Sequence, residues 1–291
     1  MRSWWAGQAT STRGLSRTPA GLAIKHAALD LPLPASRSLT IARFLPAYAR
    51  DAGIRRQWRL EDALERSLDA AAIPAPPTGP ATIGTSERVI EVPWVLGRID
   101  LASSPEILDT GSAFAPHAYR RLLRRVAGAT RLHLADLVDC DIPGASAHRA
   151  DIRALPFAAD RFDVVICIST LEHIGLDNDQ YGIPKEDQVA GGDLVALREL
   201  GRVVRSAGRL LVTVPGGCDA NHRSFRQYSP TTWCALVEAA GLVHRELDFF
   251  AQHPDLGWQP VGADEVVRQR YGSLVPGAAS GLICANLERR P

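Results

Sequence analysis

The chain has 291 residues, 46% of them hydrophobic, and a net charge of +1 from 33 basic and 32 acidic side chains. This size suits one large domain, or one domain with an added segment, and allows a sizeable core. The near-zero charge gives no global field that favours nucleic acid or an anionic membrane, and the arginines are scattered. No run of residues approaches the length of a membrane span. We therefore expect neither a nucleic-acid partner nor a membrane span.

The five cysteines argue against two kinds of site. Their number is odd and no CxxC spacing occurs, so neither a disulfide framework nor a zinc site is indicated. Cys167 and Cys284 lie in apolar runs and are expected in the core. The His and Asp residues of the predicted loops form no close pair of ligands such as HxxxH, so no metal is expected. A reducing, cytoplasmic location fits this usage best.

The N-terminal part differs from the rest of the chain. Residues 1–37 are rich in Ser, Ala, Gly, Arg and Pro, whereas residues 38–73 look helical. The first 29 residues contain no acid, as in a transit peptide, but a flexible terminus is favoured. The breaker-rich sequence PAPPTGP at 74–80 predicts a linker. The helical stripe consists of Leu60, Leu64, Leu68 and Ala72.

Two parts are therefore predicted. Residues 1–80 form a flexible N-terminus and a helical cap segment, and residues 81–291 form the main domain, with an insertion near 251–281.

After the linker, predicted strands and helices alternate. Alternation of this kind predicts an α/β fold with a mostly parallel sheet and helices on both faces. Strands are expected at 106–110, 131–136, 147–151, 163–169, 209–214, 242–250 and 282–287. Helices are expected at 116–126 and 230–240, with a third that carries Leu194, Leu197, Leu200 and Val204 and ends at Gly208.

Acidic side chains follow the first three predicted strands. Asp109 precedes a turn in which Gly111 would let a ligand approach the backbone, and the next helix offers free N–H groups. Asp136 ends the second strand, where a carboxylate can accept hydrogen bonds from a ribose diol. Asp151 ends the third strand and can face an adenine amino group. Each acid alone could be an ordinary turn or helix cap, but three after successive strands favour one nucleotide-type pocket.

These motifs together resemble the class I S-adenosylmethionine-dependent methyltransferases. The similarity covers about residues 103–250 and 282–288 and runs through ILDTGS, LADL, DIRALPFAADRFDVV, STLEHIG and LRELGRVVRSAGRLLVTVP. It implies a Rossmann-like seven-stranded sheet with an antiparallel last strand, and S-adenosyl-L-methionine as the cofactor. ERVIEVPWVLGRI and GLDNDQYG further suggest a bacterial subgroup that acts on small molecules or glycans. The cofactor-binding residues implied are Asp109, Gly111, Ser112, Asp136, Asp151, Ile152 and Ser169.

The first motif departs from the family pattern. Where the family continues Asp-x-Gly-x-Gly-x-Gly, this chain has Ala113 and Ala115 at the second and third glycines. Each alanine adds a methyl group where the methionine part of the cofactor passes close to the backbone. A degenerate, non-catalytic binding module is therefore an alternative. A nicotinamide-dependent oxidoreductase is disfavoured because GxGxxG is lacking.

Candidates for the acceptor side come from loops at the same sheet edge. Glu172 and His173 leave the fourth strand directly, and His173 is a candidate general base for a hydroxyl, with Glu172 orienting it or the substrate. Ordinary capping by His173 is the competing interpretation. Because no acidic and aromatic motif for an amine stands out, O-methylation of a small molecule or glycan is favoured. The substrate-binding candidates are Asp177, Tyr181, His222 and Tyr228.

Overall fold

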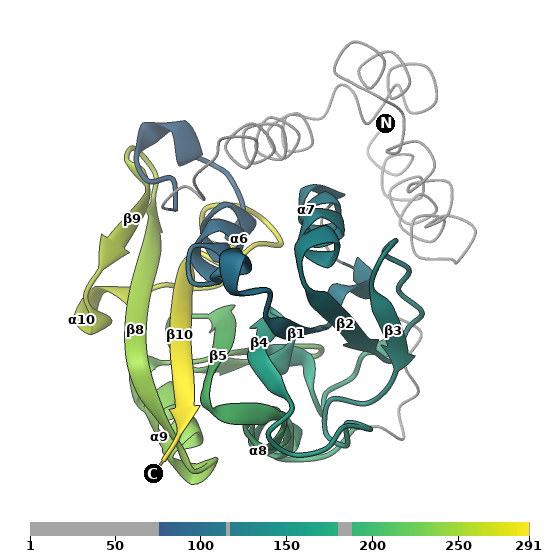
Figure 1. The fold of residues 1–291 in the computed structure, drawn as a ribbon. Coiled ribbons are helices and arrows are strands. Elements are labelled where there is room, and N and C mark those ends of the chain that lie inside the picture. The colour runs from purple at the N-terminus through teal and green to yellow at the C-terminus, as the bar shows by residue number, and fades with distance from the viewer. Residues whose placement is uncertain (1–75, 115–116, 180–187, 291) are drawn as a thin grey trace, which may run out of the picture.

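A computed structural model describes residues 76–114, 117–179 and 188–290. In this part of the chain an eight-stranded sheet has the order β3-β2-β1-β4-β5-β10-β8-β9 (Figure 1). The first five strands in that order are parallel, whereas β10 is antiparallel to both β5 and β8. The strands are β1 (Glu106–Thr110), β2 (Arg131–Asp136), β3 (Ser146–Arg149), β4 (Phe162–Ile168), β5 (Val204–Pro215), β8 (Leu242–His253), β9 (Gly257–Val261) and β10 (Gly281–Arg289); β6 (Ala220–Asn221) and β7 (Arg226–Gln227) form a separate pair.

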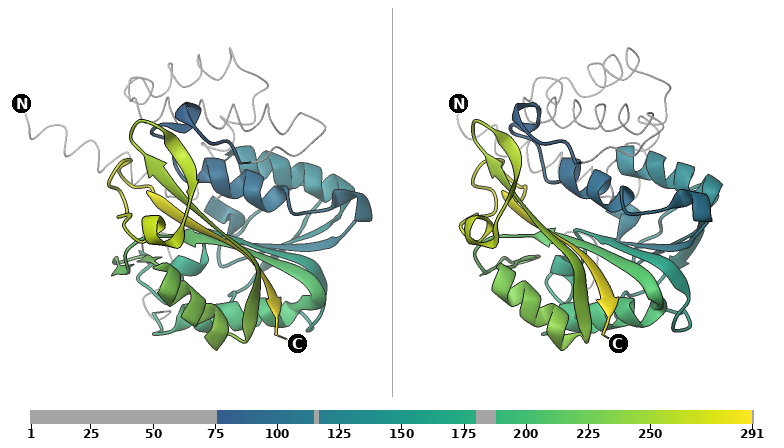
Figure 2. Two further views of the ribbon diagram at one scale, coloured as in Figure 1. Left: turned by 90° about the vertical axis from the view of Figure 1, so that its left-hand side faces the viewer. Right: turned by 60° about the vertical axis from the view of Figure 1, so that its left-hand side comes forward.

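Helices cover both faces of this sheet. Figure 2 shows α6 and α7 on one side and α8 and α9 on the other. The strand β4 packs against both layers, with Val164 and Ile166 toward α6 and α7, and Val165 and Cys167 toward α8 and α9. A strand buried on both faces has the continuous apolar sequence that β4 shows. The helices are α6 (Arg88–Leu96), α7 (His117–Ala129), α8 (Gly192–Val203), α9 (Pro230–Ala239) and α10 (Ala263–Val266), with short 3-10 turns η1 (Pro80–Thr82), η2 (Leu101–Ser103), η3 (Ser112–Phe114) and η4 (Leu171–His173).

The predicted Rossmann-like α/β architecture is confirmed, including the antiparallel last strand. The strands at 106–110 and 131–136 have the bounds that the sequence predicts. The predicted count of seven strands is wrong by one, because β9 forms within the predicted insertion and pairs with β8. Cys167 and Cys284 are fully buried, as expected.

The prediction that Gly208 ends a helix is wrong. The helix α8 ends at Val203 and β5 begins at Val204 without a loop. The register of β4 against β5 shifts between Phe162 and Val164, so four residues of β5 bulge there. Gly208 is the last residue of that bulge, and a Cβ atom on it would lie 2.9 Å from the Asp163 carbonyl oxygen. The glycine is needed for close backbone approach rather than for a helix cap.

The helix α6 has no counterpart among the predicted elements. Pro93 lies inside it, and a proline usually interrupts a helix. All residues from Val89 to Leu96 are nevertheless buried. Packing against the sheet on this scale outweighs the lost backbone hydrogen bond, so tertiary contacts decide this helix.

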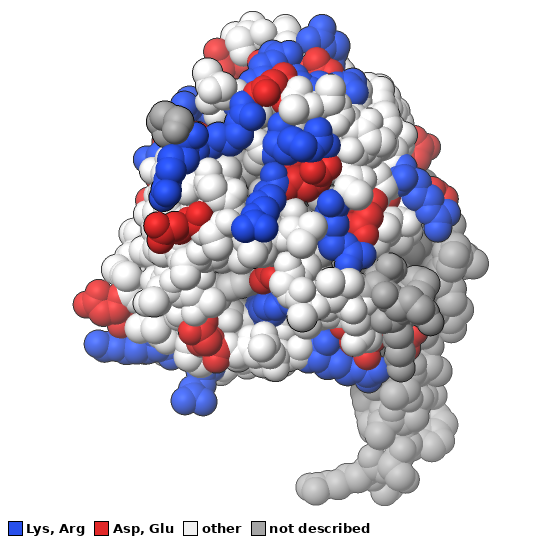
Figure 3. All heavy atoms as spheres, turned by 90° about the horizontal axis from the view of Figure 1, so that it is seen from below, with Lys and Arg blue, Asp and Glu red and all other residues white. Residues whose placement is uncertain are grey.

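The described surface carries mixed charge. On the face shown in Figure 3, basic and acidic side chains are interspersed. Among the described helices, none is both long and apolar enough to cross a bilayer. The predicted helical segment 38–73 lies outside the described residues.

The turn after β1 depends on Gly111, which has a φ of 81°. A Cβ atom there would lie 2.0 Å from Thr170 Oγ1 in the loop after β4. We expect Gly111→Ala to lower the free energy of unfolding by about 2–4 kcal/mol, from left-handed backbone strain and overpacking. Chemical denaturation measures this cost. Gly128→Ala, in α7 with nothing within 4 Å of its Cβ position, is the control and should be neutral or stabilising. Equal effects of the two substitutions would contradict the close approach.

Candidate active site

A pocket of about 310 Å³ lies at the carboxyl edge of the parallel strands. The loops after β1, β2, β3 and β4 all contribute to its wall, as expected for a ligand site in an open α/β sheet. It therefore brings together most of the side chains that the sequence singles out. Those that line it are Gly111, Ser112, Asp136, Asp151, Ile152, Ser169 and His173.

Asp136 stands at the end of β2 with both carboxylate oxygens held by backbone. Its Oδ2 accepts a hydrogen bond from the N–H of Ala113 at 3.0 Å, and its Oδ1 accepts one from Val138 at 3.0 Å. Burial raises the pKa of Asp136, and the backbone hydrogen bonds partly oppose this rise. Each oxygen retains a second lone pair for a ligand hydroxyl. The carboxylate is thus fixed in orientation at the pocket wall.

Asp151 and Ile152 form the wall beyond β3. Arg153 binds the Asp151 carboxylate, with Nε 2.9 Å and Nη2 2.6 Å from Oδ2. Although burial raises the pKa of Asp151, the hydrogen bonds from Arg153 bring it below its usual value. The group is therefore ionised at neutral pH. Ile152 is buried and supplies an apolar surface beside it.

Asp109 lies behind the pocket wall rather than in it. Its carboxyl group is 1% exposed, and its Oδ2 accepts a hydrogen bond from the hydroxyl of Tyr119 on α7. Burial raises the pKa of Asp109 to about 8, an effect that Tyr119 partly opposes and the charge of Asp136 increases. Tyr119 itself lines the pocket.

Two buried polar atoms beside this wall have no hydrogen-bond partner. They are Oδ1 of Asp109 and Oγ of Ser112. An orphaned buried polar group costs about 1–3 kcal/mol, so such atoms often mark a place where a ligand supplies the partner. Both flank the turn at Gly111, which lines the pocket.

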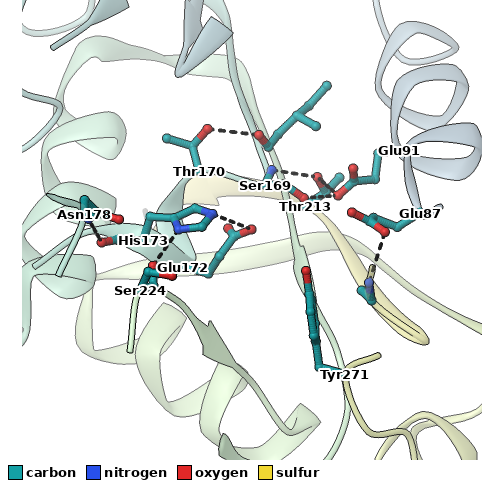
Figure 4. Close-up of polar contacts among 12 residues, drawn as sticks. Glu87, Glu91, Ser169, Thr170, Glu172, His173, Asn178, Thr213, Ser224 and Tyr271 are labelled. Atoms are coloured by element: carbon teal, nitrogen blue, oxygen red, sulfur yellow. Dashed lines mark hydrogen bonds and ion pairs between the residues drawn. The ribbon is translucent and has the colours of Figure 1, made fainter. Parts of the chain in front are cut away.

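A buried carboxylate on α6, that of Glu91, lies behind another side of the pocket and binds two residues that line it. Oε1 of Glu91 accepts hydrogen bonds from Ser169 Oγ at 2.5 Å and Thr213 Oγ1 at 2.8 Å. Its Oε2 accepts one from Arg88 Nη1 at 2.6 Å. Ser169, a predicted cofactor residue, thus lines the pocket while its hydroxyl is bound to Glu91 (Figure 4). These bonds place Arg88 in the pocket wall.

His173 also lines the pocket, and its ring is held in one tautomer. Nδ1 lies 2.6 Å from the carbonyl oxygen of Ser224. Because a carbonyl only accepts, Nδ1 carries the proton, and in the neutral ring Nε2 holds the lone pair. Burial lowers the pKa of His173 to about 4, and the bond to Ser224 partly opposes this change. The imidazole is therefore neutral over the physiological range.

Glu172, the neighbour of His173, is 3% exposed and does not line the pocket. Its Oε1 lies 3.8 Å from Nε2 of His173, and its Oε2 has no hydrogen-bond partner. Burial raises the pKa of Glu172 to about 8. Figure 4 shows its carboxyl group directed toward the side of the site where Glu87 and Glu91 lie.

The acceptor-side candidates are not all brought together. Asp177 accepts a hydrogen bond from Arg223 Nε at 2.7 Å, which joins the loops after β4 and β5. His222 is exposed and stacks on Phe225 at 4.3 Å between ring centroids. Tyr228 is buried away from this pocket, where its hydroxyl donates to Asp193 at 3.0 Å. Tyr181 lies outside the described residues.

Among the residues of the pocket wall that sequence reasoning missed are Arg88, Tyr119 and Thr170. Tyr119 follows Asp109 by ten positions, and no local pattern relates a strand acid to a helix tyrosine at that distance. Arg88 lies on the unpredicted helix α6. Thr170 directly follows the predicted Ser169, so its place in the sequence could have indicated it.

Comparison with known proteins supports the predicted resemblance. Residues 123–212, fewer than half of the chain, match the model of a family described as a methyltransferase domain. The predicted resemblance to S-adenosylmethionine-dependent methyltransferases is thereby confirmed for this part of the chain. S-adenosylmethionine is the cofactor that this match supports. The more specific bacterial subgroup stays a prediction. No curated protein matches the sequence significantly.

The solved structures that resemble this chain are distant. The [4+2]-cyclase SpnF shares 16% identity with a TM-score of 0.37, over 51% of this chain and 58% of its own. A Haloferax volcanii methyltransferase complex with the activator Trm112 shares 15% identity with a TM-score of 0.46, over 83% and 99%. The Burkholderia thailandensis 1,6-didemethyltoxoflavin-N1-methyltransferase shares 15% identity with a TM-score of 0.38, over 90% and 93%. This chain thus spans less than two thirds of the cyclase, and likeness at this distance identifies no substrate.

The residues that line the pocket fit S-adenosylmethionine. Ser112 and Asp136 line the pocket, where the orphaned Oγ of Ser112 can accept a hydrogen bond from an α-ammonium group and Asp136 suits a ribose diol. Ala113, at the altered second glycine, is buried in the hydrophobic core and does not line the pocket. The methyl group of Ala113 therefore does not reduce the volume of the pocket. Ala115 lies outside the described residues.

The raised pKa of Asp109 predicts a pH-dependent stability. Native Asp109 keeps its proton up to about pH 8, whereas an unfolded aspartate releases it near its ordinary pKa of 3.8. Its contribution is therefore complete below about pH 4 and is lost as pH rises toward 8. Relative to Asp109→Asn, the wild type should lose stability between pH 5 and pH 8. Urea denaturation at several pH values tests this, with exposed Asp139→Asn as the control. Parallel pH profiles for wild type and Asp109→Asn would contradict the assignment.

Proposed function

We propose that this protein transfers the methyl group of S-adenosylmethionine to a hydroxyl oxygen of a small molecule or glycan, with His173 as the general base. The observation that carries the proposal is the fixed tautomer of His173 at the pocket wall. Nδ1 donates to the Ser224 carbonyl, so Nε2 is the proton acceptor. A lowered pKa keeps this nitrogen unprotonated, although it also makes it a weaker base.

The other residues have distinct roles in this proposal. S-adenosylmethionine, when bound, supplies an electrophilic methyl group. Asp136 and Asp151 would hold the ribose and adenine, and Ser112 would contact the amino-acid end. Asp109 would support this wall from behind through its hydrogen bond with Tyr119. The acceptor hydroxyl would release its proton to Nε2 of His173 as its oxygen bonds to the methyl carbon. The bond between that carbon and the sulfur would break, and S-adenosylhomocysteine would be the leaving group. Glu172 would position the acceptor beside His173.

The altered glycine motif favours a second candidate, a binding module without turnover. Ala113 and Ala115 replace family glycines near the methionine end of the cofactor. Binding and transfer are therefore tested by separate experiments.

Cofactor binding should depend on Asp136. We expect Asp136→Asn to weaken the binding of S-adenosylhomocysteine at least about tenfold, because a charge-assisted hydrogen bond contributes about 1.5–3 kcal/mol. Isothermal titration calorimetry measures the dissociation constant. Asp139→Asn, an exposed neighbour in the same loop, should bind like the wild type. If the wild type binds neither S-adenosylmethionine nor its product, the proposed function fails.

Methyl transfer should depend on His173, whereas cofactor binding should not. We expect His173→Gln to lower kcat about 10²–10⁴-fold, the usual contribution of a general base. Transfer of radiolabelled methyl to a panel of phenols, alcohols and sugars measures activity, and calorimetry with S-adenosylhomocysteine checks the pocket. His253→Gln, on a half-exposed histidine, is the control. Cofactor binding without transfer to any acceptor would favour the binding module, and undiminished transfer by His173→Gln would exclude the base.

A further inference from the structure

A group of buried ionisable side chains lies beside His173, and the proposed function gives its carboxyl groups no role in holding the cofactor. We call it the acidic cluster; it consists of Glu87, Arg88, Glu91 and Glu172. Its three carboxyl groups are 9%, 0% and 3% exposed, respectively. Arg88 interacts electrostatically with all three, so one guanidinium group faces three acids. Such an excess of buried carboxyl groups is costly unless a further cation reaches it.

The partners within the cluster are unequally distributed. Both oxygens of Glu91 are occupied, by Ser169, Thr213 and Arg88. Glu87 accepts a hydrogen bond from the backbone N–H of Ala279 at 3.1 Å. Glu91 and Arg88 thus form a closed pair, and the remaining acidity belongs to Glu87 and Glu172.

Glu172 is the member that points to a ligand. Its Oε2 has no hydrogen-bond partner in the protein. Because the side chain is 97% shielded from solvent, water does not replace that partner. Figure 4 shows this carboxyl group directed across the site toward Glu87 and Glu91. Burial, together with the neighbouring Glu91 and Glu87, raises the pKa of Glu172 to about 8. A bound cation would stabilise the ionised form of this carboxyl group and so lower its pKa again.

Aromatic rings adjoin the same end of the site. Phe225 lies 6.1 Å from His173 and 4.3 Å from Tyr271 between ring centroids. His222 stacks on Phe225. Tyr271 is directed toward the acidic cluster in Figure 4. Rings beside carboxylates form a surface that suits a protonated amine attached to an apolar or aromatic body.

We infer that the methyl acceptor carries a protonated amine, which Glu172 and Glu87 bind while its hydroxyl group faces His173. This inference rests on the proposed function and names its substrate class. The 3.8 Å between Glu172 Oε1 and His173 Nε2 favours an ammonium and a hydroxyl on neighbouring carbons. The sequence did not reveal this arrangement because two of the three acids lie on α6 and at its start, far from Glu172 along the chain.

The test compares two probes of nearly equal shape. One is 2-amino-1-phenylethanol, and the other is 1-phenyl-1-propanol, in which a methyl group replaces the ammonium. Each is titrated calorimetrically into the full-length protein saturated with S-adenosylhomocysteine. We expect the amine to bind at least about tenfold more tightly than the alcohol, as one buried charge-assisted hydrogen bond implies.

Matched variants assign this preference to the acidic cluster. Glu172→Gln keeps the shape of the side chain and should reduce the preference to about threefold or less, and Glu87→Gln should reduce it in part. Glu238→Gln, on a side chain that is 74% exposed, should keep the full preference. Unchanged S-adenosylhomocysteine affinity in all three variants shows that the fold and the cofactor pocket are intact.

Three results would overturn the inference. The first is a wild type that binds the amine no more tightly than the alcohol, including the case in which neither binds. The second is a preference that survives Glu172→Gln. The third is a Glu172→Gln variant that weakens S-adenosylmethionine but not S-adenosylhomocysteine, because the cluster would then serve the cofactor's sulfonium. Loss of S-adenosylhomocysteine binding by the wild type would instead refute the proposed function itself.

Discussion

The buried carboxylate of Glu91 is the interaction on which the site depends. It is fully shielded from solvent, and it joins α6 to the ends of two central strands through Ser169 and Thr213. A buried charge is stable only when its hydrogen bonds are satisfied, and here donors from β5, from the loop after β4 and from Arg88 satisfy it. Because the geometry of all three donors is fixed, α6 is held over the carboxyl edge of the sheet. The pocket wall at Arg88 and the position of Glu87 both follow from this one contact.

The pocket is built differently at its two ends. Toward the adenosine end, Asp136 and Asp151 already have backbone or arginine partners that orient them. Toward the methionine end, Asp109 and Ser112 keep buried oxygens without partners. The first end is therefore preorganised, whereas the second stores a cost that a ligand can relieve. The replacement of a family glycine by Ala113 is compatible with this design because its methyl group packs into the core.

On the acceptor side, the neighbours of the buried Glu172 indicate its role. Glu172 and His173 follow one strand and could be an ordinary turn. The contact between His173 and Ser224 fixes a tautomer, and the approach of Glu87 and Glu91 makes Glu172 one of three acids around one guanidinium. Three buried carboxyl groups around one guanidinium group are not explained by stability, because apolar packing would stabilise the fold more. The proposed binding of an ammonium group would account for the acidic cluster.

Local patterns were sufficient for much of the fold. Apolar runs predicted the bounds of the buried strands β1 and β2 to the residue. A strand that is buried on both faces needs consecutive apolar side chains, and this pattern is visible in the sequence. The bulge that ends at Gly208 escaped prediction because a glycine after a helical stripe looks like a helix cap. The helix α6 escaped because Pro93 argues locally against a helix that only burial stabilises.

The sequence by itself determined the α/β architecture, the family resemblance and the acids that follow successive strands, since each is a short-range pattern. Only the tertiary structure decided that Asp109 faces Tyr119 instead of the pocket, and that Tyr228 binds Asp193 away from it. The tertiary structure also brings Glu91 of α6 to Ser169. The last contact joins residues 78 positions apart. No periodicity encodes a contact of that range, because it arises from the packing of a helix across a sheet whose strands come from distant parts of the chain.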